Sequence, residues 1–419
     1  MSLTDFKDKL SFYVPPSELA TITQVVVSGK GSFYQDTDGK NFLDFTSGIF
    51  TNNFGHGDEE ITEILAKVFG SLGNIHGRQW IGAPDFYRRL FCFLPSKDYR
   101  VVAYGDGGGY TVDRCLTELF YHFGKRPFNL LTLTGGFHGK TIGNKLAVNP
   151  NESCSFFHTH TAPPPYCYRC PFGKERTTCK LKCATALEEQ LLQTQTQVFM
   201  FEPVLGGAVI VPPAEYWQRI AKFCRAHSIF LVADEVLVGG GRIGTFLAST
   251  HYGIIPDAIL LTKGLANGLP ISVMLLKKKL TENTYSRREL NYSSTFVNVP
   301  ALMAVASKVM EKLERDNIFA NVRARSEQLI RGLKALQKKF PIIGDVRGLG
   351  LIVGVEFVHP DKSSDAEFCQ KVFKAAEHNG LELILPTSNV LRFAPPLNVT
   401  DSEISLCLQI FERSLHDVR

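Results

Sequence analysis

The sequence predicts an α/β fold, in which a mostly parallel sheet covered by helices is joined to a smaller α+β unit. From about residue 58 to 300, short apolar segments alternate with amphipathic helical ones. This alternation is typical of a parallel sheet covered on both faces. After residue 300, a long helical region leads to further strands that lie outside the alternation. A chain of 419 residues is also long enough for two or three packed units.

The predicted elements follow in chain order. Residues 25–45 alternate apolar and polar side chains around an Asp-x-Asp-Gly turn, which indicates a β-hairpin. In residues 213–228, the helical spacing places Tyr216, Ile220, Phe223 and Cys224 on one face. A long helical region covers 301–319. The predicted strands of the main sheet are 100–104, 129–135, 198–204, 229–236, 258–262 and 271–277.

We expect three parts along the chain. An N-terminal segment, 1–50, packs with the smaller domain, and residues 51–305 form the large domain. Residues 306–419 form the C-terminal small domain, with strands in "VRGLGLIVGVEF" and "LILPTSNVLRFAPPL". No internal repeat and no low-complexity linker interrupts this order.

Composition narrows the class of protein. A content of 44% hydrophobic and 21% charged residues is that of a globular chain. The net charge of +5 comes without a concentrated basic block, so we do not expect a nucleic-acid partner. The longest apolar stretch, 258–276, contains Lys263, Asn267 and Pro270 and is not expected to span a membrane. A cytoplasmic location is the resulting expectation.

Four of the ten cysteines cluster within 17 positions, in "YCYRCPFGKERTTCKLKC". They are Cys167, Cys170, Cys179 and Cys183. The first two have a metal-type Cys-x-x-Cys spacing, and the second two are spaced more loosely. In a reducing compartment, the choices are a small metal site or free thiols in a packed loop. The context matches no known zinc module, so the sequence favours free thiols and no metal.

Two opposite charges stand at the ends of predicted strands. Asp234 follows "IFLVA" and Lys263 follows "AILLT". Ligands of open parallel sheets bind at the carboxyl ends of the strands, so both side chains are expected to face one crevice. A buried acid and a buried lysine are the two groups that pyridoxal phosphate requires: one holds the pyridinium nitrogen and the other forms the Schiff base.

Each of these residues also has a structural interpretation. Lys263 alone is compatible with a lysine that extends to solvent from a strand end, and Asp234 alone with a turn or helix cap. Two further candidates for the site also have such an interpretation, since Arg392 alone is compatible with a structural ion pair and Phe137 alone with a core position. The combination in chain order favours the functional interpretation.

The chain resembles the class III pyridoxal-phosphate aminotransferases, which include the ornithine, acetylornithine and 4-aminobutyrate aminotransferases. The segments "LVADEVLVGGGRIGTF" and "LLTKGLANGLPISVML" look like the signature of this family. "GGFHGKTIG", "FEPV", "SSTF", "VRGLGLIVGVEF" and "LRFAPPL" follow in the family's order. The resemblance implies the fold-type-I transferase architecture, with a large seven-stranded sheet domain, and a homodimer with shared active sites.

The resemblance also implies roles for single residues. Lys263 forms the aldimine with the cofactor and then moves the proton, so it is catalytic together with Asp234, which keeps the pyridine nitrogen protonated. Phe137 stacks on the ring, with His138 beside it. Further roles fall to Gly107 and Gly108 at the cofactor phosphate, to Thr295 at the phosphate in the neighbouring subunit, and to Arg392 at the substrate carboxylate.

The chain departs from the family's pattern around the cofactor. Asp106 stands where a hydroxyl usually contacts the phosphate, and Gly109 replaces a glutamate. Leu237 replaces a glutamine that bonds the ring hydroxyl. The segment "EPVLGGAVIVPP" lacks the family's second glutamate, and Asn298 with Val299 replaces Gly-Asn.

We therefore expect an aminotransferase that moves an amino group from a carboxylate-bearing donor to a keto acceptor. Two alternatives stay open at this point. The Cys-Tyr-Arg-Cys-Pro-Phe loop is similar to one in relatives that racemise amino acids, and racemisation begins with the same loss of the α-proton. A catalytically silent homologue that binds the cofactor is the other alternative.

Overall fold

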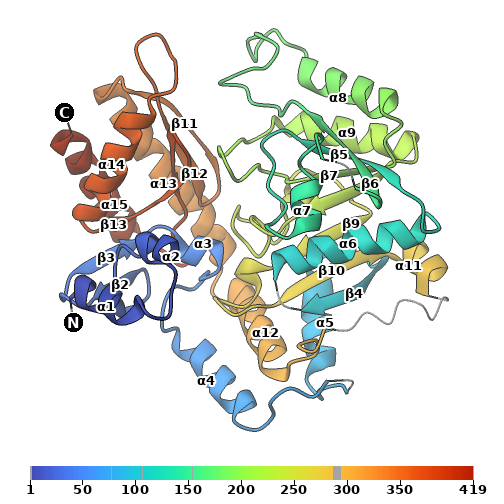
Figure 1. Ribbon diagram of the computed structural model, residues 1–419, viewed down its shortest axis with the longest axis horizontal. Coiled ribbons are helices and arrows are strands. Elements are labelled where there is room, and N and C mark those ends of the chain that lie inside the picture. The colour runs from blue at the N-terminus through green and yellow to red at the C-terminus, as the bar shows by residue number, and fades with distance from the viewer. Residues whose placement is uncertain (1, 77, 106, 153, 286–293, 419) are drawn as a thin grey trace.

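The computed structural model describes residues 2–76, 78–105, 107–152, 154–285 and 294–418. Figure 1 shows two lobes, one built around the large sheet and one formed by the two ends of the chain. The predicted α/β architecture with a mostly parallel sheet and a smaller sheet-containing part is confirmed. Within the described residues, no helix is both long enough and apolar enough to cross a lipid bilayer.

The large sheet has seven strands in the order β4-β10-β9-β8-β7-β5-β6. The strands from β9 to β6 are parallel, and β10 runs antiparallel to both of its neighbours. Six of the seven were predicted, while β6 was missed. Their bounds are β4 Tyr99–Gly105, β5 Phe128–Leu133, β6 Phe157–Ala162, β7 Val198–Phe201, β8 Phe230–Asp234, β9 Ala258–Leu261 and β10 Ser272–Lys277.

Alternation along the strands explains the two covered faces. In β7, Phe199 and Phe201 join one apolar cluster with helices α8 and α9, whereas Val198 and Met200 join another with α6. Successive strand side chains point to opposite faces, so a strand buried on both sides is apolar throughout. The helices of this lobe are α5 Ala83–Cys92, α6 Gly108–His122, α7 Ile142–Leu146, α8 Lys182–Gln193, α9 Ala214–Ala226, α10 Ala248–His251 and α11 Lys278–Tyr285.

The other lobe contains two four-stranded sheets, ordered β1-β2-β3-β13 and β11-β12-β15-β14. The predicted N-terminal hairpin forms the first, and β3 pairs in parallel with β13 from the far end of the chain. The strands are β1 Val26–Lys30, β2 Phe33–Asp36, β3 Asn41–Asp44, β11 Ile343–Leu349, β12 Ile352–Phe357, β13 Leu381–Glu382, β14 Ile384–Thr387 and β15 Val390–Phe393. The helices α1 Leu3–Leu10, α2 Pro16–Thr21, α14 Ala366–His378 and α15 Asp401–Asp417 belong to this lobe.

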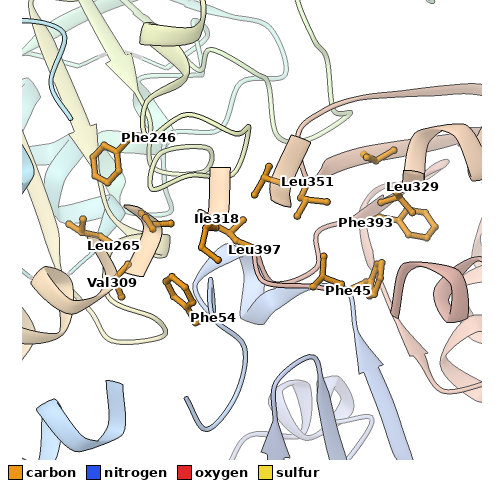
Figure 2. Close-up of a cluster of buried hydrophobic side chains, with 14 of the residues drawn as sticks. Phe45, Phe54, Phe246, Leu265, Val309, Ile318, Leu329, Leu351, Phe393 and Leu397 are labelled. Carbon is orange, nitrogen blue, oxygen red and sulfur yellow. The ribbon is translucent and has the colours of Figure 1, made fainter. Parts of the chain in front are cut away.

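The long helical region predicted after residue 300 is two helices, α12 Pro300–Arg315 and α13 Ile318–Lys339. Asn317 separates them with a left-handed φ of 53°, a conformation that asparagine adopts more easily than most residues. The short α3 Ser47–Phe50 and α4 Glu59–Phe69 complete the helices. One apolar core joins the lobes, and Figure 2 shows Phe45, Phe54, Phe246 and Phe393 among its members.

Candidate active site

A cavity of about 810 Å³ lies where the large sheet meets β14 and β15. Glu202 follows β7, Asp234 is the last residue of β8 and Lys263 follows β9, and all three contribute to its wall, as does Arg392 from β15. This is the strand-end crevice in which ligands of open parallel sheets bind. Its volume is in the range of small-molecule sites.

Lys263 lies in the turn η1 Lys263–Leu265, directly after β9, with an unusual φ of 27°. The residue after Lys263 is held by Asn53, whose side-chain amide donates to the carbonyls of Gly264 and Gly240 at 2.8 and 2.9 Å. Burial lowers the pKa of Lys263, and the charge of Arg392 lowers it further. The charges of Asp234 and Glu202 raise this pKa, but the lowering effects are larger. Within the described residues, the Lys263 amine has no hydrogen bond and no ion pair. A partly buried amine with a lowered pKa is suited to act as a nucleophile.

Asp234 and His138 form a buried pair. Asp234 ends β8, and its Oδ2 lies 2.7 Å from His138 Nδ1, while its Oδ1 accepts the Val236 amide at 3.1 Å. Burial lowers the pKa of His138, but the hydrogen bond to Asp234 and the charges of Asp234 and Glu202 outweigh it, so the pKa is raised. His138 therefore holds its proton more firmly and is suited to donate a hydrogen bond to Asp234, which keeps this carboxylate oriented.

Glu202 is a cavity residue that sequence reasoning missed. It follows β7 and is buried, and its two oxygens accept the Phe137 and Gly206 amides at 2.9 and 3.1 Å. Burial raises the pKa of Glu202, and the Asp234 charge adds to the rise while His138 opposes it. The signal was present in "FMFEPV", where an acid follows an apolar strand as Asp234 does.

Arg392 reaches the cavity from β15. Its Nη1 donates to the Gly206 carbonyl at 2.5 Å, and its guanidinium lies 4.8 Å from the ring centre of Phe50. Burial lowers the pKa of Arg392 to about 10, with Glu202 opposing, so the group stays charged at neutral pH. In the part of the chain that the structure describes, no carboxylate pairs with it and its Nε has no partner. It is therefore available to an anionic ligand.

The start of α6 forms another end of the cavity. Gly108 and Gly109 line it, whereas Gly107 lies outside it as the residue that precedes the helix, with a φ of 153°. A Cβ on Gly108 would come within 2.9 Å of Val236 Cγ1. Among the described residues, the buried Thr262 hydroxyl has no partner. Bare amides at a helix start and a free hydroxyl fit a phosphate group. Asp106 lies outside the described residues.

Of the other predicted site residues, Phe137 lines the cavity and is half exposed, at 52%. Thr295 does not line the cavity, and its backbone carbonyl accepts from Asn74 Nδ2 at 2.6 Å. The structure thus brings Lys263, Asp234, His138, Phe137, Gly108 and Arg392 together, but neither Gly107 nor Thr295.

Leu237 also lines the cavity, where it packs against Gly206. At the position where the family has a glutamine that bonds the ring hydroxyl, this chain therefore makes an apolar contact. Even so, the cavity wall holds a lysine, a carboxylate and a helix start, and the Thr262 hydroxyl, which has no partner among the described residues, lies beside Gly108. This set of groups fits pyridoxal phosphate, which needs a lysine, an acid for its ring nitrogen and an anion site.

The cysteine cluster lies elsewhere, around a second cavity of about 350 Å³ lined by Cys167, Cys170, Cys179 and Cys183. All ten cysteines are free thiols. In the described ranges, no group of three or more histidine, cysteine or acidic side chains is placed to hold a metal ion.

Comparison with known proteins shows the family of the chain. The model of the class-III aminotransferases matches residues 14–415. The chain is 31% identical to an adenosylmethionine-8-amino-7-oxononanoate aminotransferase of Geobacter sulfurreducens, over 94% of this chain and 92% of the relative. It is 27% identical to a leucine/methionine racemase of Thermococcus litoralis, over 98% and 95% of the two chains.

Among solved structures, a PLP-bound amine transaminase from an uncultivated Pseudomonas species superposes with a TM-score of 0.87. The two chains are 25% identical, and the match covers 97% of each. The fold is therefore that of the fold-type-I transferases, as the resemblance implied. The chain belongs to the class-III aminotransferase family and is a pyridoxal-phosphate-dependent aminotransferase.

Proposed function

We propose that the 810 Å³ cavity moves an amino group from a carboxylate-bearing donor to a keto acceptor, with Lys263 and Asp234 as its catalytic residues. The observation that carries this proposal is the partly buried Lys263 amine, which has no partner among the described residues and lies in the same cavity as the Asp234–His138 pair. Pyridoxal phosphate, when bound, supplies an aldehyde for the lysine and a ring that takes up electrons from the substrate carbon.

In this proposal, each side chain has a defined task. The Lys263 amine accepts the proton of the substrate α-carbon and returns it, and burial, which lowers its pKa, makes the return easier. Asp234, oriented by His138, holds the proton on the ring nitrogen. The amides of Gly108 and Gly109 and the Thr262 hydroxyl hold the phosphate. Arg392 binds the substrate carboxylate through its planar fork.

The proposed activity has a direct test. Purified protein with added pyridoxal phosphate is supplied with a panel of L-amino acids and a keto acid, and both products are measured. We expect equal amounts of new keto acid and new amino acid. A protein that binds the cofactor but forms neither product with any donor contradicts the proposal.

Replacing Arg392 with lysine is expected to raise the KM for the amino acid donor by about 10- to 100-fold, with a smaller change in kcat. A lysine keeps the charge but cannot offer two parallel N–H donors to a carboxylate. Steady-state kinetics measure this change. Arg219→Lys is the matched control, since Arg219 pairs with Glu188 on the large lobe, outside the cavity. An unchanged KM in Arg392→Lys would contradict the proposal that Arg392 binds the substrate carboxylate.

Racemisation is the second candidate, because the chain is 27% identical to a relative named as a leucine/methionine racemase. Both reactions begin with proton loss at the α-carbon, and they differ in where the proton returns. The separating experiment supplies an L-amino acid without any keto acceptor. Formation of the D-amino acid while the visible band of the lysine-linked cofactor persists favours racemisation over transfer.

A homodimer with shared active sites is part of the proposal. Large apolar side chains are exposed near the cavity mouth and beside Thr295, which supports a covering partner. They include Ile49, Phe137, Ile142 and Phe296, with 49%, 52%, 79% and 57% of their surface exposed. Thr295 itself lies outside the cavity of its own chain, which supports an action on the partner's cofactor.

Mixing two variants tests the shared site. Thr295→Ala alone is expected to weaken cofactor binding by roughly tenfold, through loss of one hydrogen bond to a charged group. Lys263→Ala alone is expected to be inactive. A hybrid dimer of the two keeps one complete site, made of Lys263 from one chain and Thr295 from the other. At limiting cofactor, the activity of the mixture should exceed the sum of the activities of the two separate variants. If the mixture only equals this sum, Thr295 does not act in the partner's site.

We further propose a cytoplasmic location. Ten free cysteines, four of them around one cavity, suit a reducing compartment. Fractionation of producing cells with an antibody to the chain tests this, and recovery outside the cytoplasm contradicts it.

A further inference from the structure

Arg392 belongs to a row of three residues across the smaller sheet. The strand register places Arg347 of β11 opposite Gly354 of β12, and Gly354 opposite Arg392 of β15. Residues that are directly opposite in antiparallel strands lie on the same face. Two arginines therefore flank a glycine on one face of the sheet.

This face receives the segment 206–209, which follows Glu202 in the cavity wall. Arg392 Nη1 donates to the Gly206 carbonyl at 2.5 Å, while Arg347 Nε donates to the carbonyls of Ala208 and Val209 at 3.0 Å each. A Cβ on Gly354 would lie only 2.9 Å from Val209 Cβ. The bare glycine thus makes room for the segment.

Val209 shows that the segment needs this support. Its φ of 50° lies in the left-handed region, where a β-branched side chain is strained. The surrounding contacts must hold such a conformation in place. Arg347 provides one such contact, because its Nε donates to the Val209 carbonyl at 3.0 Å.

Glu356 in turn holds Arg347. It is two positions after Gly354 on the same face of β12, and it is buried to 1% exposure. Its Oε2 lies 2.8 Å from Arg347 Nη1. Tyr166 and Arg169, from the loop that carries the cysteines, and Asn389 also donate to the Glu356 carboxylate. A buried carboxylate with this many donors is a fixed anchor.

We propose that Arg347 and Glu356 are positioning residues for carboxylate binding by Arg392. Glu356 fixes Arg347, Arg347 fixes the segment 206–209, and the Gly206 carbonyl orients Arg392. Neither Arg347 nor Glu356 lines the cavity, so neither touches substrate or cofactor. This inference rests on the proposed function, in which Arg392 binds the substrate carboxylate.

The test measures the affinity for pentanoate, a carboxylate without an amino group, by calorimetry and as an inhibition constant against the donor. Glu356→Gln and Arg347→Lys are each expected to weaken pentanoate binding by about tenfold. The affinity for pyridoxal phosphate should stay unchanged. Glu188→Gln is the matched control, because Glu188 also pairs with an arginine, at 2.5 Å, but remote from this row.

The outcomes separate the inference from the proposed function. If Arg392→Lys binds pentanoate as the wild type does, the proposed carboxylate role of Arg392 fails. If Arg392→Lys is weakened while Glu356→Gln and Arg347→Lys are not, only the positioning role fails. Equal loss of cofactor and pentanoate affinity in both variants also overturns it, since that indicates a general structural effect.

A milder variant covers the case in which Glu356→Gln does not fold. Tyr166→Phe removes one phenol donor to Glu356 and keeps the ring, over which the Arg347 guanidinium lies at 4.7 Å. It is expected to weaken pentanoate binding by a few-fold without lowering cofactor affinity. Wild-type pentanoate affinity in both Tyr166→Phe and Arg347→Lys contradicts the proposal.

Discussion

Replacing Lys263 with alanine is expected to lower kcat by on the order of 10⁴-fold, because it removes both the nucleophile and the proton carrier of the proposed reaction. The visible absorbance band of lysine-linked pyridoxal phosphate is expected to disappear, since the amine that links the cofactor is gone. The fold should persist, because the Lys263 side chain has no hydrogen bond among the described residues. Spectra, steady-state kinetics and the unfolding temperature measure the three effects.

Lys277→Ala is the control for this change. Lys277 is also a partly buried lysine of the large sheet, but it pairs with Asp257 at 3.0 Å and lies outside the 810 Å³ cavity. Its loss should reduce stability slightly and leave both the band and kcat near the wild-type values. A Lys263→Ala protein that keeps the band, or more than about a hundredth of the activity, would show that another amine does this work.

The proposed catalytic pair, Asp234 and Lys263, could be selected from the sequence because both residues lie at strand ends. An apolar strand followed by a charged residue places that residue at the crevice of a parallel sheet, and this argument holds for both Asp234 and Lys263. The same argument applies to Glu202, which we did not select. The short strand β7 is followed at once by this acid, so the local pattern alone was sufficient.

Other parts of the site were beyond a local pattern. The row of Arg347, Gly354 and Arg392 depends on strand register in the smaller sheet, and one sequence does not fix which strands pair. In the sequence, nothing distinguishes Glu356 from other strand residues. Its donors Tyr166 and Arg169 lie 190 and 187 positions earlier, and only the fold brings them to it. The sequence also could not show that the Lys263 amine and the Arg392 guanidinium lack an ionic partner among the described residues, because this depends on how the two lobes pack.

The departures from the family's pattern have different structural weight. Leu237 replaces a hydrogen-bonding residue with an apolar contact against Gly206, and it leaves the Lys263, Asp234 and Arg392 positions intact. Gly109 supplies a further bare backbone position where the family has a glutamate side chain. The missing second glutamate leaves Arg392 without a carboxylate partner among the described residues. A cavity changed in this way keeps the three groups to which we assign the proposed reaction.

Replacing Asp234 with asparagine is expected to lower kcat by on the order of 10³-fold while the cofactor stays linked to Lys263. An amide cannot hold a proton on the ring nitrogen, so the ring takes up electrons less well. The pKa of His138 should fall as well, because the hydrogen bond and charge of Asp234 are what raise it against burial. Kinetics, the visible spectrum and an NMR titration of His138 report these three changes.

The combination of results identifies the role of Asp234. Loss of activity with the visible band retained indicates action at the ring, whereas loss of both indicates a collapsed cavity. Asp257→Asn is the matched control, since Asp257 also accepts a backbone amide, that of Leu231 at 3.0 Å, but does not line the 810 Å³ cavity. It should retain nearly full kcat. If Asp234→Asn retains more than about a tenth of wild-type kcat, a different group must hold the proton at the ring nitrogen.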